Sequence, residues 1–171
     1  VQADAVFQAL IRLGHEPCLL ACDLNLERLK DQLSALNPDL VFNLVESLNG
    51  QGRLIHLVPF LLDSLKIAYT GAPAEAIYTT SNKLMAKSLL LAHQLSTPLW
   101  AIADSNGSVR FQSLPDDKPQ GQDLLIIKSV WEHASLGLDG NGLVPFTDIA
   151  ELGRVMHTRT ADLGGSCFAE R

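Results

Sequence analysis

The sequence is poor in positive charge and has no long run of apolar residues. Its 171 residues include 13 Lys and Arg against 19 Asp and Glu, a formal net charge of −6. No basic run and no basic stripe interleaved with aromatics occurs, which argues against a broad nucleic-acid surface. No apolar stretch reaches the ~20 residues that a transmembrane helix needs. We therefore expect no nucleic-acid partner and no membrane partner.

Cysteine is scarce too, because Cys18, Cys22 and Cys167 are the only three. Such a number is unsuited to a disulfide scaffold and fits a reducing cytoplasm, which is the localisation we expect. Cys18 and Cys22 have no second ligand pair nearby, so we expect no zinc site. The chain opens on an amphipathic pattern after Val1, with no signal peptide. Since it starts on Val and its last residues read as an interrupted strand, we expect a fragment.

The first half alternates helical and strand patterns. Hydrophobic content is 47% and charged content 19%, as in soluble globular proteins, and the length suits one domain or two small ones. Apolar residues recur at helical spacing in three stretches, with Asp23 as the expected cap of the second. Strand candidates at 17–21 and 40–45 alternate with these helices, and 40–45 is apolar enough to be covered on both faces. We therefore predict a parallel α/β sheet for residues 1–79.

The second half, residues 80–171, has shorter strands, and we place the domain boundary near Thr79 and Thr80. The pattern predicts a helix from Asn82 to about Leu95 with Ser81 as its cap. It also predicts strands at 99–103, 109–112 and 124–128, a hairpin-type turn at 104–107, a helix from a Thr147 cap to His157, and a last strand from about Ser166. We expect an α+β fold with antiparallel strands.

Two lysines stand where a cation is costly unless an anion binds. Lys83 is expected in the first turn of a helix, where it opposes the helix dipole at a cost of a few tenths to about 1 kcal/mol. Lys128 ends an apolar strand and opens the loop 129–137, whose backbone N–H groups are suited to phosphate oxygens. One nucleotide phosphate would satisfy both lysines. Alternatively, Lys128 snorkels to water, and Lys83 forms a solvated face with Lys87, one helical turn away.

Polar residues at other strand ends are further candidates. Glu170 follows an apolar strand, where it either accepts a hydrogen bond from an adenine amino group or pairs with Arg171. Asn43 and Glu46 end the second expected strand, and Arg53 follows a glycine-containing loop. Ligands of open α/β sheets bind beyond the carboxyl ends of strands, so we assign these three residues to a substrate-side loop. Asn43 alternatively serves only to satisfy buried backbone. No catalytic triad follows from spacing, and no catalytic residue is assigned.

Six segments then occur in a familiar order. They are VFNLVE (41–46), YTG (69–71), SNKLMAK (81–87), TPLW (97–100), IIK (126–128) with EHASLG (132–137), and FAER (168–171). Together they resemble D-alanine–D-alanine ligases and their ATP-grasp relatives, over nearly the whole chain. The resemblance implies a Rossmann-like pre-ATP-grasp domain at residues 1–79 and a central ATP-grasp subdomain at 80–171. The third domain, which carries the metal-binding carboxylates, is expected to be missing.

The resemblance also implies roles for single residues. In this family, lysines matching Lys83 and Lys128 contact ATP phosphates, the loop matching 132–137 closes over them, and the acid matching Glu170 lies by the adenine. The implied ATP-binding residues are Lys83, Lys128, Glu132, Ala134, Ser135, Gly137 and Glu170. Mg²⁺ would bridge the phosphates, held by ligands outside this chain.

The sequence departs from the family pattern on the substrate side. Ser129 replaces the usual Pro after the strand lysine. Ala134 replaces a serine that helps to position the amino-acid substrate, and the pair at 46–47 replaces His-Gly. Because the nucleotide-contacting positions match better than the substrate-contacting ones, we expect a substrate other than D-alanine.

The predicted function is ATP-dependent carboxylate–amine ligation of the D-alanine–D-alanine ligase type, forming an amide through an acylphosphate. Small-molecule carboxylate and amine substrates would be the partners, and family members are often homodimers through the first domain. The fragment by itself should bind nucleotide weakly without turnover. The alternatives are a non-catalytic ATP-grasp-like module that binds a nucleotide or a regulatory partner, and an α/β domain whose lysines are all superficial. A downstream acid and Glu-x-Asn pattern in the full gene would favour the enzyme.

Overall fold

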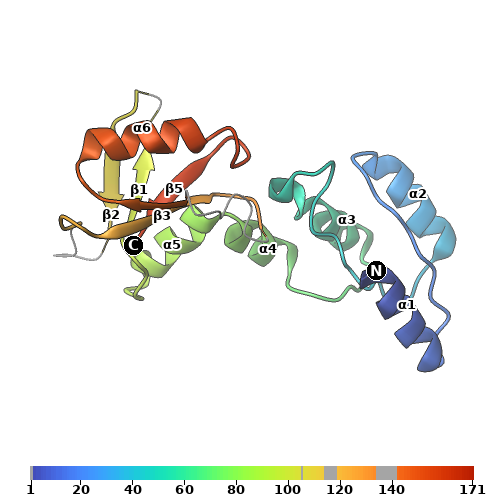
Figure 1. Cartoon of the computed structure of the whole chain (residues 1–171). Helices are drawn as coiled ribbons and strands as arrows, with labels where there is room; N and C mark the ends of the chain where they lie inside the picture. The colour runs from blue at the N-terminus through green and yellow to red at the C-terminus, as the bar shows by residue number, and fades with distance from the viewer. Residues whose placement is uncertain (1, 105, 114–118, 134–141) are drawn as a thin grey trace.

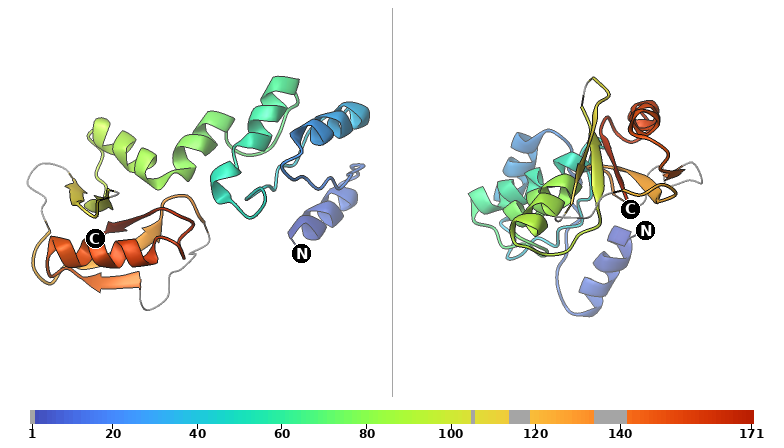
Figure 2. Two further views of the ribbon diagram at one scale, coloured as in Figure 1. Left: turned by 90° about the horizontal axis from the view of Figure 1, so that it is seen from above. Right: turned by 90° about the vertical axis from the view of Figure 1, so that its left-hand side faces the viewer.

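The computed structural model describes residues 2–104, 106–113, 119–133 and 142–171 (Figure 1). Helix α4, Ala74–Ser81, joins two parts of the molecule, which we name the N-terminal region (residues 2–73) and the sheet region (residues 82–171). The two regions lie side by side along the length of the molecule, with α4 between them (Figures 1 and 2).

The N-terminal region is helical. Its elements are α1 (Gln2–Arg12), α2 (Leu26–Leu36), the 3-10 helix η1 (Gly52–Leu54) and α3 (Leu57–Leu65). A small core joins Leu29 and Leu33 of α2 to Val58 and Leu62 of α3, with Leu48 between them. These elements confirm the three predicted helical stretches, although the third is divided into η1 and α3.

The cap of α2 differs from the prediction by two residues. The side chain of Asn25 accepts a hydrogen bond from the Arg28 backbone N at 3.0 Å, and so caps the helix. Asp23 accepts from the Asn25 backbone N at 2.8 Å and forms an ion pair with Arg28. Asp23 therefore fixes the turn that leads into the helix, whereas Asn25 satisfies the helix end itself.

The parallel sheet predicted for residues 1–79 is not formed by the described residues. Segment 17–21 is not a strand, and 40–45 contributes a single parallel bridge between Val41 and Tyr69. Leu40 and Phe42 remain 53% and 46% exposed. The prediction failed because apolar composition indicates only that a segment is suited to burial. It does not indicate whether a second strand lies beside that segment. A stable sheet needs about three strands or a covering helix.

The sheet region holds an antiparallel sheet. Its strands are β1 (Trp100–Ala103), β2 (Val109–Gln112), β3 (Leu124–Ser129), β4 (Leu143–Pro145) and β5 (Cys167–Glu170), in the order β2-β1-β5-β3-β4. Each neighbouring pair is antiparallel, which confirms the α+β prediction for this half. The short edge strand β4 was not predicted. It is only three residues long and has a single half-buried residue, so its sequence pattern is too short to indicate a strand.

One helix covers each face of this sheet (Figure 1). Strand residues alternate between the two faces, so Leu125, Ile127 and Ala169 pack on one side with Leu152 and Met156 of α6 (Ile149–Arg159). On the other side, the buried residues Trp100 and Phe168 pack with Leu84 and Leu91 of α5 (Lys83–Ala92). Asp148 caps α6 through the Glu151 backbone N, one residue after the predicted Thr147 cap.

The helical conformation is interrupted at Asn82, between α4 and α5. The backbone of this residue is extended, and its side chain accepts hydrogen bonds from the backbone N of Leu84 and Met85, both at 3.0 Å. Ser81, the predicted cap, is instead buried at the end of α4. The domain boundary predicted near residue 79 falls inside α4, which contacts α3, η1 and α5. Lys83 does begin a helix, as expected.

Candidate functional site

The candidate site lies between α5 and the sheet, around Glu170. Strand β5 is central, and its register pairs Glu170 with Trp100 of β1 and with Ile126 of β3. Lys128 is two residues after Ile126 and so lies on the same face of the sheet. Its ammonium group donates a hydrogen bond to Oε1 of Glu170. We name Lys83, Lys87, Lys128, Glu132 and Glu170 the lysine–carboxylate cluster.

Lys87 occupies the other oxygen of Glu170. Its ammonium donates to Oε2 at 2.9 Å and to Oγ1 of Thr97 at 2.8 Å, and it lies 4.9 Å from the ring centroid of Trp100. Only 7% of Lys87 is exposed, so the alternative of a solvated face is wrong for this residue. Sequence reasoning missed its role because a lysine four residues after Lys83 fits a buried pair and an exposed face equally well.

The carboxylate of Glu170 is held ionised by the two lysines. Burial alone raises its pKa, but the hydrogen bonds and charges of Lys128 and Lys87 outweigh this effect, and the pKa lies below its ordinary value. The alternative pairing of Glu170 with Arg171 is wrong, since Arg171 faces Asp123, with 3.4 Å between their charged atoms. Glu170 is therefore a half-buried anion shared by two cations.

Lys83 lies close enough to this pair to be affected by its charge. Its ammonium donates to the backbone oxygen of Glu132 at 2.7 Å, and its backbone N donates to the Val130 oxygen at 3.1 Å. Burial is the first cause that lowers the pKa of Lys83, and the positive charge of Lys128 is the second, while Glu132 and Glu170 oppose them. The ammonium groups of Lys83 and Lys128, which come from distant segments of the chain, thus repel each other in a partly desolvated environment.

Glu132 connects this cluster to the N-terminal region. Its carboxylate accepts hydrogen bonds from the Gly52 backbone N at 3.1 and 3.2 Å, and its own backbone N donates to Oγ of Ser129 at 3.0 Å. A Cβ on Gly52 would lie 2.9 Å from Oε2 of Glu132, so only glycine fits here without a shift. The rings of Tyr78 and Trp131 lie 6.2 Å apart beside this contact.

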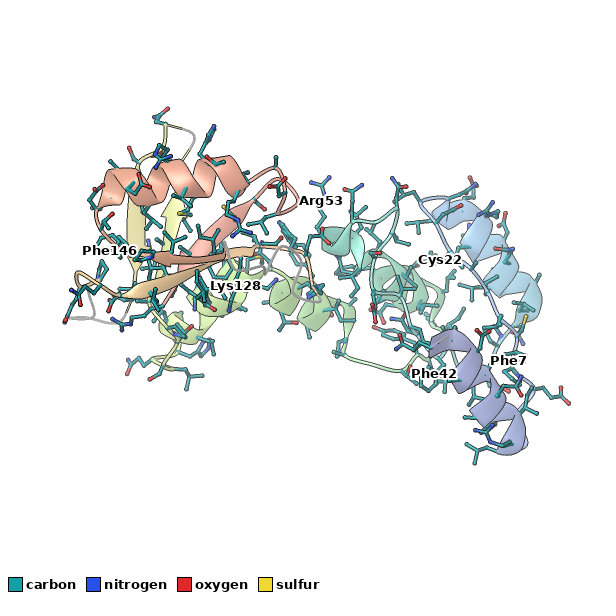
Figure 3. The ribbon with its side chains drawn as sticks, viewed as in Figure 1. Phe7, Cys22, Phe42, Arg53, Lys128 and Phe146 are labelled. Atoms are coloured by element: carbon teal, nitrogen blue, oxygen red, sulfur yellow. The ribbon has the colours of Figure 1, made fainter. Side chains whose placement is uncertain are left out.

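The residues predicted for the substrate-side loop do not join the cluster. The side-chain oxygen of Asn43 accepts from the Val45 backbone N at 3.1 Å, which is the alternative, backbone-satisfying role. Glu46 is exposed, and Arg53 donates from Nε to Gln51 at 2.9 Å. Figure 3 shows Arg53 on η1 and Lys128 on the sheet, on the two sides of α4. Of the predicted phosphate loop, Ala134, Ser135 and Gly137 lie outside the described residues.

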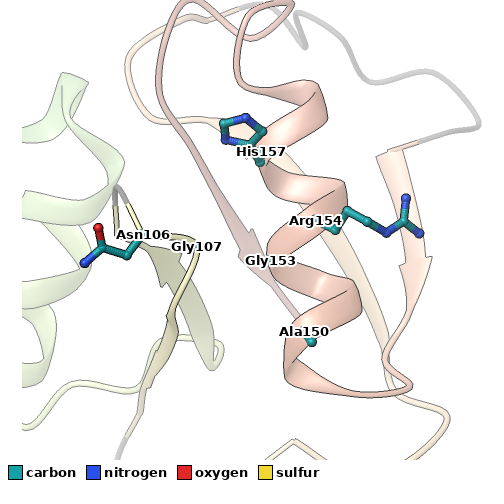
Figure 4. A pocket seen from close by; sticks show the side chains of 6 residues that line it. All are labelled: Asn106, Gly107, Ala150, Gly153, Arg154 and His157. Carbon is teal, nitrogen blue, oxygen red and sulfur yellow. The ribbon is translucent and has the colours of Figure 1, made fainter.

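A second feature is a depression on the opposite face of the sheet region. It measures about 390 Å³ and lies between α6 and the turn that follows β1 (Figure 4). Its lining residues are Asn106, Gly107, Ala150, Gly153, Arg154 and His157. Arg154 is held by Glu151 on its own helix, and His157 is exposed. The polar side chains among its described lining residues, Asn106, Arg154 and His157, are all exposed, so the lysine–carboxylate cluster is the stronger candidate.

The described part of the chain offers no metal centre. No group of three or more His, Cys, Asp or Glu side chains that could hold an ion occurs in the described ranges. Over the same ranges, no helix combines the length and the apolar character needed to span a bilayer.

No known protein-family profile matches the chain, but several proteins are similar to it in sequence. It is 37% identical over 95 residues to a D-alanine–D-alanine ligase of Moorella thermoacetica (56% of this chain, 29% of that protein). A D-alanine–D-alanine ligase of Carboxydothermus hydrogenoformans is 27% identical over 138 residues (80% and 42%). An uncharacterized protein, y4sG, of Sinorhizobium fredii is 30% identical over 130 residues (71% and 38%).

Among solved structures, the D-alanine–D-alanine ligase from Coxiella burnetii shares the fold, with a TM-score of 0.50 at 18% identity (78% of this chain, 35% of that one). The chain is thus similar in sequence and in fold to D-alanine–D-alanine ligases. This ligase-like chain matches at most 42% of the length of the relatives named above.

In this D-alanine–D-alanine ligase-like chain, the positive charge of the cluster exceeds the negative charge that faces it. Lys83, Lys87 and Lys128 carry three positive charges, and Glu170 and Glu132 carry two negative ones. The carboxylate of Glu132 accepts from Gly52, whereas that of Glu170 forms ion pairs with Lys87 and Lys128. Three ammonium groups therefore gather where a single carboxylate, that of Glu170, forms ion pairs with two of them.

Proposed function

We propose that this chain carries nucleotide-contacting residues of an ATP-dependent carboxylate–amine ligase whose substrate is not D-alanine. The observation that supports the proposal is the gathering of Lys83 and Lys128 beside Glu132 and Glu170, where burial and the positive charge of Lys128 lower the pKa of Lys83. Within the described residues, each ammonium group has one oxygen partner, Glu132 O or Glu170 Oε1. Since an ammonium group has three N–H donors, donors remain for phosphate oxygens.

The proposed reaction transfers the terminal phosphoryl group of ATP to a carboxylate, which gives an acylphosphate and ADP. An amine then attacks the acyl carbon, the C–O bond to phosphate breaks, and an amide and phosphate are released. Lys83 and Lys128 would neutralise phosphate charge and orient the nucleotide, which is electrostatic and positional catalysis. Among the described residues no group of metal ligands occurs, and in this proposal the ligands of Mg²⁺ lie outside this chain.

The substrate is proposed from the sequence positions on the acceptor side. Ala134 stands where D-alanine ligases have a serine that helps to position the amino-acid substrate, and the pair at 46–47 stands where they have His-Gly. Glu46 is exposed and takes no part in the lysine–carboxylate cluster. Alanine at position 134 has no hydroxyl group with which to position D-alanine, so another carboxylate or amine is the better candidate.

Calorimetric titration with a non-hydrolysable ATP analogue and Mg²⁺ tests the nucleotide part of the proposal. We expect Lys128→Ala to weaken binding roughly tenfold or more, because a hydrogen bond to a charged group contributes ~1.5–3 kcal/mol. Lys30→Ala on α2 is the matched control, since Lys30 is an exposed lysine in the other region. Absence of heat with the wild type, or equal heats with Lys128→Ala, would sink the proposal.

A non-catalytic, nucleotide-binding module is the second candidate, and it also predicts binding at Lys83 and Lys128. Release of ADP and phosphate by the full-length protein distinguishes the two candidates. Incubation with ATP and a panel of amino acids, dipeptides and hydroxy acids should give ADP release only when a carboxylate is supplied. Tight nucleotide binding without ADP release across the panel would favour the module.

A further inference from the structure

Lys87 is the most enclosed charged group that the structure describes at the cluster. It extends from α5 toward the sheet, and its ammonium meets Glu170 at 2.9 Å, Thr97 at 2.8 Å and the face of Trp100 at 4.9 Å. These three partners take up its donor directions, and only 7% of the residue is exposed. Lys87 is therefore not placed to receive an incoming anion itself.

The role of Lys87 follows from the way in which Glu170 is shared. A carboxylate that is largely buried needs a cation, because an uncompensated charge in a protein interior is strongly unfavourable. Without Lys87, that cation would be Lys128 alone, and the two charges would cancel. With Lys87 on Oε2 and Lys128 on Oε1, two positive charges face one negative charge, so one net positive charge remains.

The remaining charge lies on the accessible side. The side chain of Lys128 is 29% exposed, whereas that of Lys87 is 8% exposed. After burial, the positive charge of Lys128 is the second cause that lowers the pKa of Lys83. Lys87 thus directs the excess charge toward Lys83 and Lys128, while Glu170 keeps Lys128 in position.

We propose that Lys87 is a positioning residue of the anion site: it neutralises Glu170 from inside the protein so that Lys128 keeps its charge for a bound polyphosphate. This inference rests on the proposed function, because it assumes that Lys83 and Lys128 bind phosphate. It goes beyond that function by assigning a role to a lysine that has no contact with the ligand.

The test uses calorimetric binding of inorganic tripolyphosphate and of the ATP analogue to four proteins: wild type, Lys87→Met, Glu170→Gln and the double variant. Lys87→Met should weaken tripolyphosphate binding roughly tenfold or more, since Glu170 then holds Lys128 alone. The double variant should bind within about threefold of Glu170→Gln, because no carboxylate remains to be neutralised. Its buried pair is replaced by uncharged groups, so it should fold even if Lys87→Met does not.

A second readout needs no ligand. The pKa of the Glu170 carboxyl, followed by NMR, should rise in Lys87→Met relative to the wild type, and Lys87→Arg should keep it low. A purely packing role for Lys87 would leave this pKa unchanged and would give no rescue in the double variant, and either result would overturn the inference. If the wild type binds neither probe, the proposed function fails and the inference with it. If it binds them and Lys87→Met binds equally well, only the inference fails.

Discussion

The N-terminal region and the sheet region bury apolar residues to different degrees. In the sheet region, Leu125, Ile127 and Ala169 are fully buried on a sheet covered by a helix on each face. In the N-terminal region, α1 buries no residue, and Phe42 is 46% exposed beside a single bridge. The difference shows that apolar composition leads to burial only where neighbouring strands or helices supply a surface to pack against.

The regions also differ in what can report on them. Both tryptophans, Trp100 and Trp131, belong to the sheet region. Tryptophan fluorescence therefore follows that region alone, whereas helical circular dichroism follows both. Urea unfolding that is monitored by both signals can therefore separate the transitions of the two regions.

The largest effect is expected from a matched pair of core truncations. Leu125→Ala should lower the free energy of unfolding by ~2–5 kcal/mol and shift the fluorescence transition, because it opens a cavity in the sheet core. Leu62→Ala removes an equally buried leucine from the N-terminal region and should shift only the dichroism transition. An equal shift of the fluorescence transition by Leu62→Ala would show that the regions unfold as one unit.

The next effect concerns the close approach of α6 to the turn after β1. A Cβ on Gly153 would lie 2.6 Å from the Gly107 backbone oxygen and 3.2 Å from Val109 Cγ2. Gly153→Ala should therefore cost ~1–3 kcal/mol, as overpacking does, measured by the urea midpoint of fluorescence. Gly121→Ala is the control, because its Cβ would meet no atom within 4 Å. Similar midpoints for the two variants would contradict the packing of α6 described above.

A smaller effect tests the link between the regions. Gly52→Ala places a Cβ 2.9 Å from Glu132 Oε2 and 3.1 Å from the Trp131 oxygen, and should cost about 1 kcal/mol. The shift should appear in the fluorescence transition although Gly52 lies in the other region. Glu132→Ala should relieve part of this cost, so the double variant should be less than additive. Strict additivity would mean that the two residues do not touch in solution.

The smallest effect concerns acid. The pKa of Glu170 in the folded chain lies below its ordinary value of 4.5, so its ionised form stabilises the fold. This contribution is complete above pH 4.5 and is lost as the pH falls through the lower, folded-state pKa. Urea midpoints followed by fluorescence should decrease over this range in the wild type and less in Glu170→Gln. Asp31→Asn, at an exposed position of α2, should leave the profile unchanged.

Much of the fold could be predicted from periodicity. The segments of α1, α2, α6, β1, β2, β3 and β5 were placed to within a few residues. The strand predicted at 40–45 is not formed. The composition of a segment does not show how many strands lie beside it. Strand β4 was missed because three residues at a sheet edge carry too short a pattern.

The candidate site could be predicted in part. Lys83 and Lys128 can be predicted as anion-binding candidates from the sequence. Lys83 is expected at the start of a helix and Lys128 at the end of a strand, and both positions disfavour an unpaired cation. Lys87 was missed, although it is the best-paired lysine of the cluster. Its partners, Thr97 and Glu170, are 10 and 83 residues away along the chain, beyond the reach of any local pattern.

By itself, the sequence determined which segments are helices and strands in the second half, and which two lysines sit at element ends, because both depend on local spacing. Only the tertiary structure decided that β5 runs between β1 and β3, and that Glu170 is shared by Lys87 and Lys128. The physical reason is that strand order and charge pairing depend on residues brought together across long stretches of chain, where burial, rather than local preference, selects the partner.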